Sequence, residues 1–189
     1  NRVNTEFFPE SGYLVADVET KLAFRCTNQV GRGVMINGAV VNDLGDTVSR
    51  FTPTHAGIGS FIFKPQSGRQ YTAVINYGNG NITTATMPAI YTSGYVMNLA
   101  DNNDGRIKVR VQAKKANATE RGEKVFLLVH AGQATKKVEY GFIAYDNDLV
   151  FYVDKSLLGE GVSHFTLFTG QQQPVAERLF FTRPNQQCS

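Results

Sequence analysis

Tryptophan is absent from this chain of 189 residues, cysteine occurs only twice, and charged residues make up 19% of the sequence. The two cysteines, Cys26 and Cys188, are too few for the disulfide framework on which many small secreted domains depend. No apolar run approaches the roughly 20 residues that a membrane-spanning helix needs. The sequence therefore argues against a disulfide-built scaffold and contains no candidate membrane helix.

Clustered positive charge is also missing, although the formal net charge is +3. The only basic doublets are Lys114–Lys115 and Lys136–Lys137. A nucleic-acid-binding surface needs basic residues gathered along one face or one stripe. We therefore expect no nucleic-acid partner.

Glycine, phenylalanine and tyrosine are well represented, with 18, 13 and 8 residues. This composition is typical of an ordered, β-rich protein and of neither a disordered chain nor a helical repeat. The length allows one large domain or two small ones, and half-length units of about 90 residues suit β-sandwiches. No charged-then-apolar leader precedes Asn1, so we expect the chain to be a piece of a longer protein.

Short runs of alternating apolar and polar residues recur along the chain, separated by turn residues, which is the period of half-buried strands. Pro88 cannot donate to a strand ladder, so we place a domain boundary there. In the first half about seven strands are expected. Phe7 and Phe8 begin the first, and Leu14–Val18 form a short second one. The clearest segments are Lys21–Thr27, Val34–Asn42, Thr47–Thr52, Ser60–Lys64, Tyr71–Tyr77 and Ile82–Thr86.

The second half repeats the pattern. The run Val125–His130, "VFLLVH", is continuously apolar and predicts a strand buried on both faces. Lys114–Lys124 lacks alternation and is interpreted as an exposed loop with room for one helical turn. The expected strands are Arg106–Ala113, Val125–Ala131, Lys136–Ile143, Leu149–Val153, Val162–Phe168 and Val175–Thr182.

The pattern predicts an all-β protein made of two consecutive immunoglobulin/fibronectin-III-like β-sandwiches, residues 1–88 and 89–189. The absence of long helices between strands excludes a doubly wound α/β fold. One large single sandwich is the alternative, and Pro88 and the similar size of the halves argue against it.

Candidate catalytic residues are few. "GIGSFIF" places Ser60 beside Gly59, with His55 five residues earlier, but it lacks the second glycine and the following helix of a nucleophile elbow. A solvated loop histidine explains His55 more simply than a general base. We assign no catalytic residue and expect no enzyme activity.

Metal-binding patterns are incomplete as well. His55, His130 and His164 are far apart in sequence and form no zinc-ligand spacing, so no metal ligand is assigned. "DNNDG", Asp101–Gly105, resembles a calcium loop in its oxygen-rich side chains, but Arg106 stands where an EF-hand needs glycine. A hairpin turn explains the same residues.

Two glycine-rich turns and four tyrosines could bind a ligand, but each also has an ordinary structural explanation. "GRG" and "GNGNI" are too short to cradle phosphate and lack the following lysine of a P-loop, so no cofactor is expected. Four tyrosines could stack on a sugar, but strand packing is the simpler reading of most of them. They are Tyr91, Tyr95, Tyr145 and Tyr152.

Two kinds of covalent modification are also considered. The sequons at Asn81 and Asn117 matter only in a eukaryotic secretory setting. Cys26 shares strand parity with Leu22 and Phe24, which predicts a small buried side chain; a bridge to Cys188 is the alternative and would have to span the two halves.

Four phrases in the first half resemble the macroglobulin-type domain of α2-macroglobulin-like proteins. They are the "FFPESGYLV" opening, a "GVMINGAVVNDLG" hairpin, "FTPTHAGIGSFIFKP", and "GRQYTAV". They fall on Phe7–Val15, Gly33–Gly45, Phe51–Pro65 and Gly68–Val74. The sequence departs from the family pattern at Ser11, where glycine is usual, and at Asn42, where an acid is usual.

The closing phrase "HFTLFTGQQQPVAERLFFTRP", His164–Pro184, is similar to the domain that follows in large surface proteins of Bacteroidetes-type bacteria, with Gln173 in place of a turn glycine. The resemblance implies a scaffold ahead of a TonB-receptor plug-like region. Separately, Asp46-Thr47-Val48 resembles the Asp-Thr-aliphatic O-glycosylation signal of such bacteria, which predicts an O-glycan on Thr47, with an ordinary strand start as the alternative. "CTNQ" at Cys26 has asparagine where a thioester motif needs glutamate, so the resemblance implies no thioester here.

We therefore expect a non-enzymatic structural or interaction module of an exported envelope protein, in the periplasm or at the outer membrane of a Gram-negative bacterium. Its expected partners are other domains of the same polypeptide or other envelope proteins, and the oligomeric state is left open. The alternatives are a glycan- or protein-ligand-binding module for nutrient uptake and a fragment of an α2-macroglobulin-like protease inhibitor.

Overall fold

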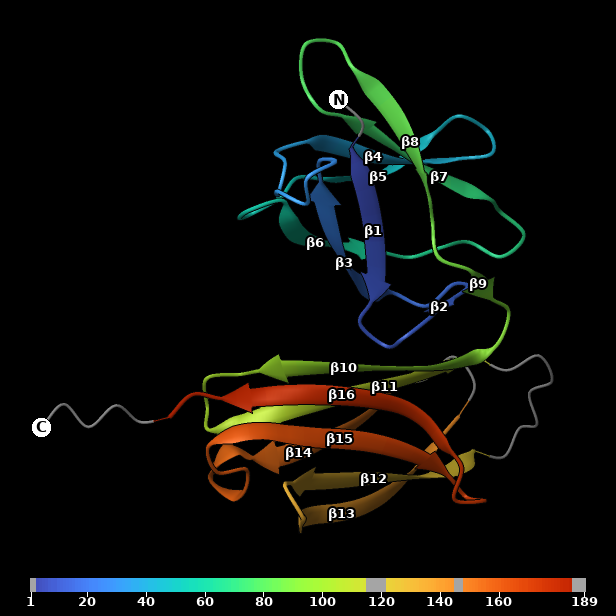
Figure 1. Ribbon diagram of the computed structural model, residues 1–189. Helices are drawn as coiled ribbons and strands as arrows, with labels where there is room; N and C mark the ends of the chain where they lie inside the picture. Colours follow the sequence, from blue (N-terminus) through green and yellow to red (C-terminus); the bar gives the residue numbers. More distant parts are fainter. Residues whose placement is uncertain (1–2, 115–121, 145–147, 185–189) are drawn as a thin grey trace, which may run out of the picture. The chain divides into compact units, whose positions relative to one another are not determined.

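The computed structural model describes residues 3–114, 122–144 and 148–184, and nearly all of them lie in strands or short turns (Figure 1). The chain divides into two compact units, Asn1–Tyr91 and Thr92–Ser189. The division falls after Tyr91 because Ile90–Tyr91 (β9) pairs in parallel with Leu14–Val15 (β2) and so belongs to the first unit. Within the described ranges, no helix has the length and apolar character needed to cross a bilayer.

The first unit contains a three-stranded and a four-stranded antiparallel sheet. The three-stranded sheet has the order β1-β3-β6, with the bounds Asn4–Pro9, Thr20–Thr27 and Ile58–Phe63. The four-stranded sheet has the order β5-β4-β7-β8, with the bounds Thr47–Phe51, Asn37–Asn42, Tyr71–Asn76 and Ile82–Thr86.

Alternation in sequence builds the core of this unit. Leu22, Phe24 and Cys26 are fully buried in β3, as their shared parity predicts, and the residues between them are more exposed. Phe51 lies between two other core aromatics, stacked on Phe61 at 4.7 Å between ring centroids and edge-on to Phe24 at the same distance. Aromatic pairs at such distances add to the stabilisation from buried area.

The second unit has the same strand order. Its three-stranded sheet is β10-β11-β14, with the bounds Gly94–Asp101, Arg106–Lys114 and Asp148–Asp154. Its four-stranded sheet is β13-β12-β15-β16, with the bounds Ala134–Ile143, Glu123–Ala131, Gly161–Thr169 and Pro174–Thr182. A single 3₁₀ turn, Lys155–Leu157 (η1), follows β14. The prediction of all-β, immunoglobulin/fibronectin-III-like sandwiches is confirmed.

Two expectations about individual strands were wrong. The sequence pattern missed β10 because Tyr95, Val96 and Met97 are all buried, so the run has no alternation to detect. The run "VFLLVH" is not buried on both faces. In β12, only Val125, Leu127 and Val129 are fully buried. The alternate side chains lie on the outer face of the four-stranded sheet.

The expected loop Lys114–Lys124 is shorter than predicted. Lys114 is the last residue of β11, and Glu123 and Lys124 are the first residues of β12. Both ends of the expected loop therefore belong to strands. Residues 115–121 lie outside the described residues.

Three of the glycines near the loop before β6 are placed where a side chain does not fit. A Cβ on Gly33 would overlap the carbonyl oxygen of Ala56, and a Cβ on Gly57 would overlap that of Cys26. A Cβ on Gly59 would lie 2.7 Å from the Phe24 ring. A backbone hydrogen bond also joins the loop to β3, because the Cys26 amide donates to the Gly57 carbonyl at 2.7 Å. The loop before β6 therefore packs directly on the backbone at the end of β3.

The close packing at Gly57 predicts that alanine substitutions at Gly57 and Gly68 differ in their cost in stability. Gly57 and Gly68 have nearly equal positive φ angles of 77° and 75°, but a Cβ on Gly68 meets nothing within 4 Å. We expect Gly68→Ala to cost about 1–2 kcal/mol through φ alone. Gly57→Ala adds overlap with backbone atoms and should cost about 2–5 kcal/mol.

Amide hydrogen exchange measures this difference locally. Gly57→Ala should lower protection in β3 and β6 and leave β11, β12 and β15 unchanged, while Gly68→Ala should change protection little. Equal effects of the two substitutions on β3 would contradict the packing argument.

Candidate functional site

His55 and Ser60 do not form a catalytic pair in the structure. His55 lies in an exposed turn closed by hydrogen bonds between its backbone and that of Ile58. Ser60 is an exposed residue of β6, opposite Ala23 in the β3–β6 register. No hydrogen bond joins the two side chains in the described part of the chain, so the geometry gives the enzyme hypothesis no support.

Asp101–Gly105 is the turn of the β10–β11 hairpin, as the alternative interpretation predicted. The Lys155 ammonium bonds to Asp101 at 2.6 Å and, with the Asn103 amide, lowers the pKa of that carboxyl. The Arg106 guanidinium lowers the pKa of Asp104 in the same way. Across the described ranges, no group of three or more histidine, cysteine or acidic side chains is arranged to hold a metal ion.

The predicted tyrosines have different environments. Tyr95 is buried in the core of the second unit, and its hydroxyl donates to Glu123 Oε2 at 2.5 Å. Tyr152 is exposed on β14, with the Arg106 guanidinium 4.8 Å above its ring. Tyr91 is exposed and lies edge-on to Tyr13 in the first unit. Packing therefore explains Tyr95, and Tyr145 lies outside the described residues.

The two modification candidates in the first unit lie at turns. Thr47 is the exposed first residue of β5, directly after the turn that closes the β4–β5 hairpin. Asn81 closes the β7–β8 turn, where its side-chain amide donates to the Gly78 carbonyl. Both side chains are exposed, and O-glycosylation of Thr47 stays a prediction. Asn117 lies outside the described residues.

Cys26 is a free, fully buried thiol in contact with the Thr5 hydroxyl, 3.3 Å away. Thr27 ends β3, and Asn28 and Gln29 lie in the turn that follows, in which Asn28 Oδ1 accepts backbone hydrogen bonds from Val30 and Arg32. Such an Asx turn explains the asparagine. Cys188, the proposed disulfide partner, lies outside the described residues.

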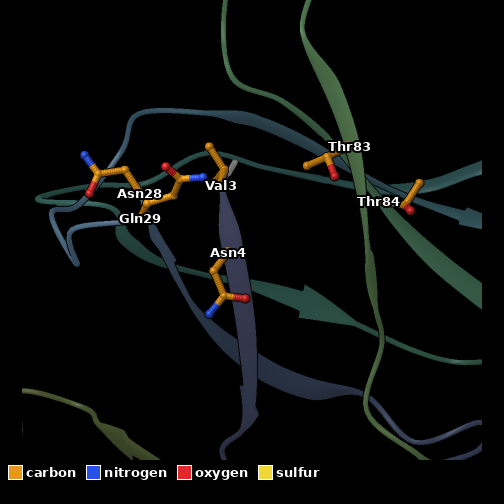
Figure 2. A pocket seen from close by; sticks show the side chains of 6 residues that line it. All are labelled: Val3, Asn4, Asn28, Gln29, Thr83 and Thr84. Atoms are coloured by element: carbon orange, nitrogen blue, oxygen red, sulfur yellow. The ribbon is translucent and has the colours of Figure 1, made fainter. Parts of the chain in front are cut away.

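An open polar depression of about 430 Å³ lies at the edge strands β1 and β8 of the first unit. Figure 2 shows Asn28 and Gln29 on one side of β1 and Thr83 and Thr84 of β8 on the other. The remaining lining residues are Val3 and Asn4. The depression offers amide and hydroxyl groups but neither a charged nor an aromatic side chain among these six, so it lacks a strong anchor for a ligand.

The outer face of the β13-β12-β15-β16 sheet is the most distinctive surface of the second unit. The register places Phe126 beside Tyr140 on one neighbouring strand and Phe168 on the other. We call the following nine apolar side chains the apolar outer face. They are Phe126, Leu128, Val138, Tyr140, Phe142, Val162, Phe168, Leu179 and Phe181.

Six members of the apolar outer face are strongly exposed, at 46–63% of their full accessibility. These six are Val138, Tyr140, Phe142, Val162, Leu179 and Phe181. The Lys124 ammonium lies 4.4 Å from the Tyr140 ring centroid and 4.9 Å from that of Phe126. At the other end of the same sheet face, the rings of His130 and His164 stack on each other. The face therefore combines aromatic and aliphatic side chains from all four strands.

The sequence contains a signal for this face, which the prediction of a strand buried on both faces explained wrongly. The run "VFLLVH" is apolar at both parities because β12 contributes to the core with one face and to the apolar outer face with the other. Val138, Tyr140 and Phe142 share one parity within the expected strand Lys136–Ile143. The sequence alone did not reveal that this parity lies opposite the core.

No protein-family model matches the chain, and no curated protein shows significant similarity to it. Among solved structures, a biofilm-associated protein BSP domain is 18% identical, with a TM-score of 0.40. The match covers 97% of this chain and 30% of that structure. Native Escherichia coli alpha-2-macroglobulin is 12% identical with a TM-score of 0.36, over 95% of this chain and 14% of its own.

A segment of two fibronectin type III domains from chicken tenascin is 16% identical, with a TM-score of 0.31, over 92% of this chain and 99% of that segment. All three TM-scores are below 0.5, so these likenesses assign neither a family nor a function. The chain spans less than a third of the first two structures. The fold assignment rests on the strand order of the two units.

Burial of Cys26 predicts a pH dependence of stability. Burial raises the pKa of this thiol above its ordinary value of 9.0, and the hydrogen bond from Thr5 opposes the rise in part. The folded chain therefore holds the thiol proton more tightly than the unfolded chain does. Its contribution to stability is complete below the unfolded pKa and is lost as pH rises through the folded pKa.

We expect the urea midpoint of the wild-type chain to fall more steeply above pH 9 than that of Cys26→Ala. Both chains should carry Cys188→Ser, so that they differ only in whether the Cys26 thiol is present. Circular dichroism at a series of pH values on either side of 9 measures the slopes. If the urea midpoint fell equally with pH in both chains, burial of the Cys26 thiol would not cause the loss of stability.

Proposed function

We propose that this chain is a non-enzymatic structural and interaction module of a larger cell-envelope protein. In this proposal, the apolar outer face of the second unit docks another domain of the same polypeptide. The observation that carries the proposal is the exposure of aromatic and aliphatic side chains on β13, β15 and β16, next to half-buried apolar side chains of β12 in the same sheet.

The size of the apolar outer face supports docking. Four strands about 4.8 Å apart and about seven residues long, with a rise of about 3.3 Å per residue, give a sheet face of roughly 300–400 Å² in projection. The largest apolar patch on an ordinary monomer is about 300–600 Å² and is often functional. A patch formed by one continuous sheet face is well shaped to pack against a second flat surface.

The composition of the face favours a protein partner over a glycan. Interface centres are enriched in aromatic residues and poor in charged ones. Leu128, Val138 and Leu179 add aliphatic surface that offers a sugar no hydrogen bond, and Lys124 already occupies the rings of Phe126 and Tyr140. A nutrient-uptake role through glycan binding remains the second candidate, supported by the same aromatic rings.

The wider setting in this proposal comes from the sequence resemblance. Phe7–Val15 resembles macroglobulin-type domains, and His164–Pro184 resembles domains of large surface proteins. We propose export to the periplasm or outer-membrane surface of a Gram-negative bacterium, within a TonB-linked system. A fragment of an α2-macroglobulin-like inhibitor is the alternative setting, in which the thioester would lie elsewhere in the polypeptide.

Site-specific photo-crosslinking in the full-length protein tests the docking proposal. A benzophenone amino acid at Phe142 should crosslink to a peptide of the same polypeptide outside these 189 residues. Ile82 is equally exposed, at 63%, but lies on the first unit and serves as the matched control position. The expected result is a strong crosslink from position 142 and little from position 82.

Equal crosslinking from both positions, or none from position 142, would overturn the docking proposal. Crosslinks from position 142 to a different protein would replace the internal partner with an external one. Turnover of peptides, esters or glycans by the chain would contradict the non-enzymatic assignment, and binding on a glycan array lost in Tyr140→Ala would favour the second candidate.

A further inference from the structure

Two of the three histidines of the chain meet across neighbouring strands. His130 of β12 is the register partner of His164 of β15, and their rings stack with centroids 4.7 Å apart and planes 9° from parallel. Both lie on the outer side of the sheet, where each is partly exposed. The third histidine, His55, lies in an exposed loop of the other unit.

The hydrogen bonds of the two rings leave corresponding nitrogens available. His164 Nδ1 lies 2.9 Å from Glu177 Oε1, and His130 Nδ1 lies 3.3 Å from the Gly132 carbonyl oxygen. Both oxygens accept hydrogen bonds, so each neutral ring carries its proton on Nδ1 and keeps the Nε2 lone pair. Histidines that bind metals almost always donate their other ring N–H to a carboxylate or a backbone carbonyl.

We propose that His130 and His164 form a two-histidine binding site for a divalent transition-metal ion such as Zn²⁺, Ni²⁺ or Cu²⁺. Imidazole nitrogens suit these ions, whereas Mg²⁺ and Ca²⁺ prefer oxygen ligands. Glu177 orients His164 and adds a compensating negative charge beside the ion. This site does not depend on the docking proposed for the apolar outer face.

Metal binding requires a small rearrangement of the rings. The Nε2 lone pairs lie in the ring planes, so nearly parallel rings must tilt for both nitrogens to approach one ion at about 2.0–2.1 Å. The χ2 torsion of histidine is broad and allows this tilt at low cost. Because the described residues provide no cluster of three candidate ligands, water fills the remaining coordination positions.

Calorimetric titration of the untagged chain with zinc chloride and nickel chloride tests the site. We expect one ion per chain, with affinity lowered at least about tenfold by His130→Ala or His164→Ala. Glu177→Gln should weaken binding by about 10–100-fold because it removes the carboxylate that orients His164. His55→Ala is the matched control and should bind like the wild type.

Nuclear magnetic resonance of the histidine rings keeps the test independent of variant folding. In the wild-type chain, zinc should shift the ring signals of His130 and His164 and leave those of His55 unchanged. Equal shifts at all three histidines, unchanged affinity in the His130→Ala/His164→Ala double variant, or no binding at millimolar zinc would overturn the proposal.

Discussion

The packing of a three-stranded sheet against a four-stranded sheet constrains everything else in each unit. Every strand in such a sandwich gives one face to the core, so alternate positions must be apolar. Cys26, Leu127 and Phe165 are fully buried for this reason, and none of them is available for chemistry at the surface. In the described part of the chain, the side chains available for chemistry therefore lie on outer sheet faces, edges and turns.

The two units differ in the features that lie outside their cores. In the first unit, the loop around Gly57 packs backbone against backbone, which explains Gly33 of "GRG" and both glycines of "AGIG" by close packing. In the second unit, apolar residues continue onto the outer face of the four-stranded sheet. Burial of that second apolar face would be favourable, and the core of the unit does not provide it.

The paired histidines and the apolar outer face arise from the same register. The antiparallel pairing of β12 and β15 places Phe126 beside Phe168 at one end and His130 beside His164 at the other. An apolar docking surface and a candidate metal site thus lie on one sheet face. His130 and His164 are 34 positions apart in sequence, and the apolar outer face combines side chains of four strands, so neither has a single local motif.

The sequence by itself determined the fold class, most of the strands and the burial of Cys26, because the alternation of apolar residues is a local property of each strand. It missed β10, where the alternation is absent, and it misjudged β12. Only the tertiary structure decided which parity of β12 faces the core and which strand lies beside it. Strand pairing depends on contacts between distant segments, and for this reason the apolar outer face and the histidine pair emerged only from the structure.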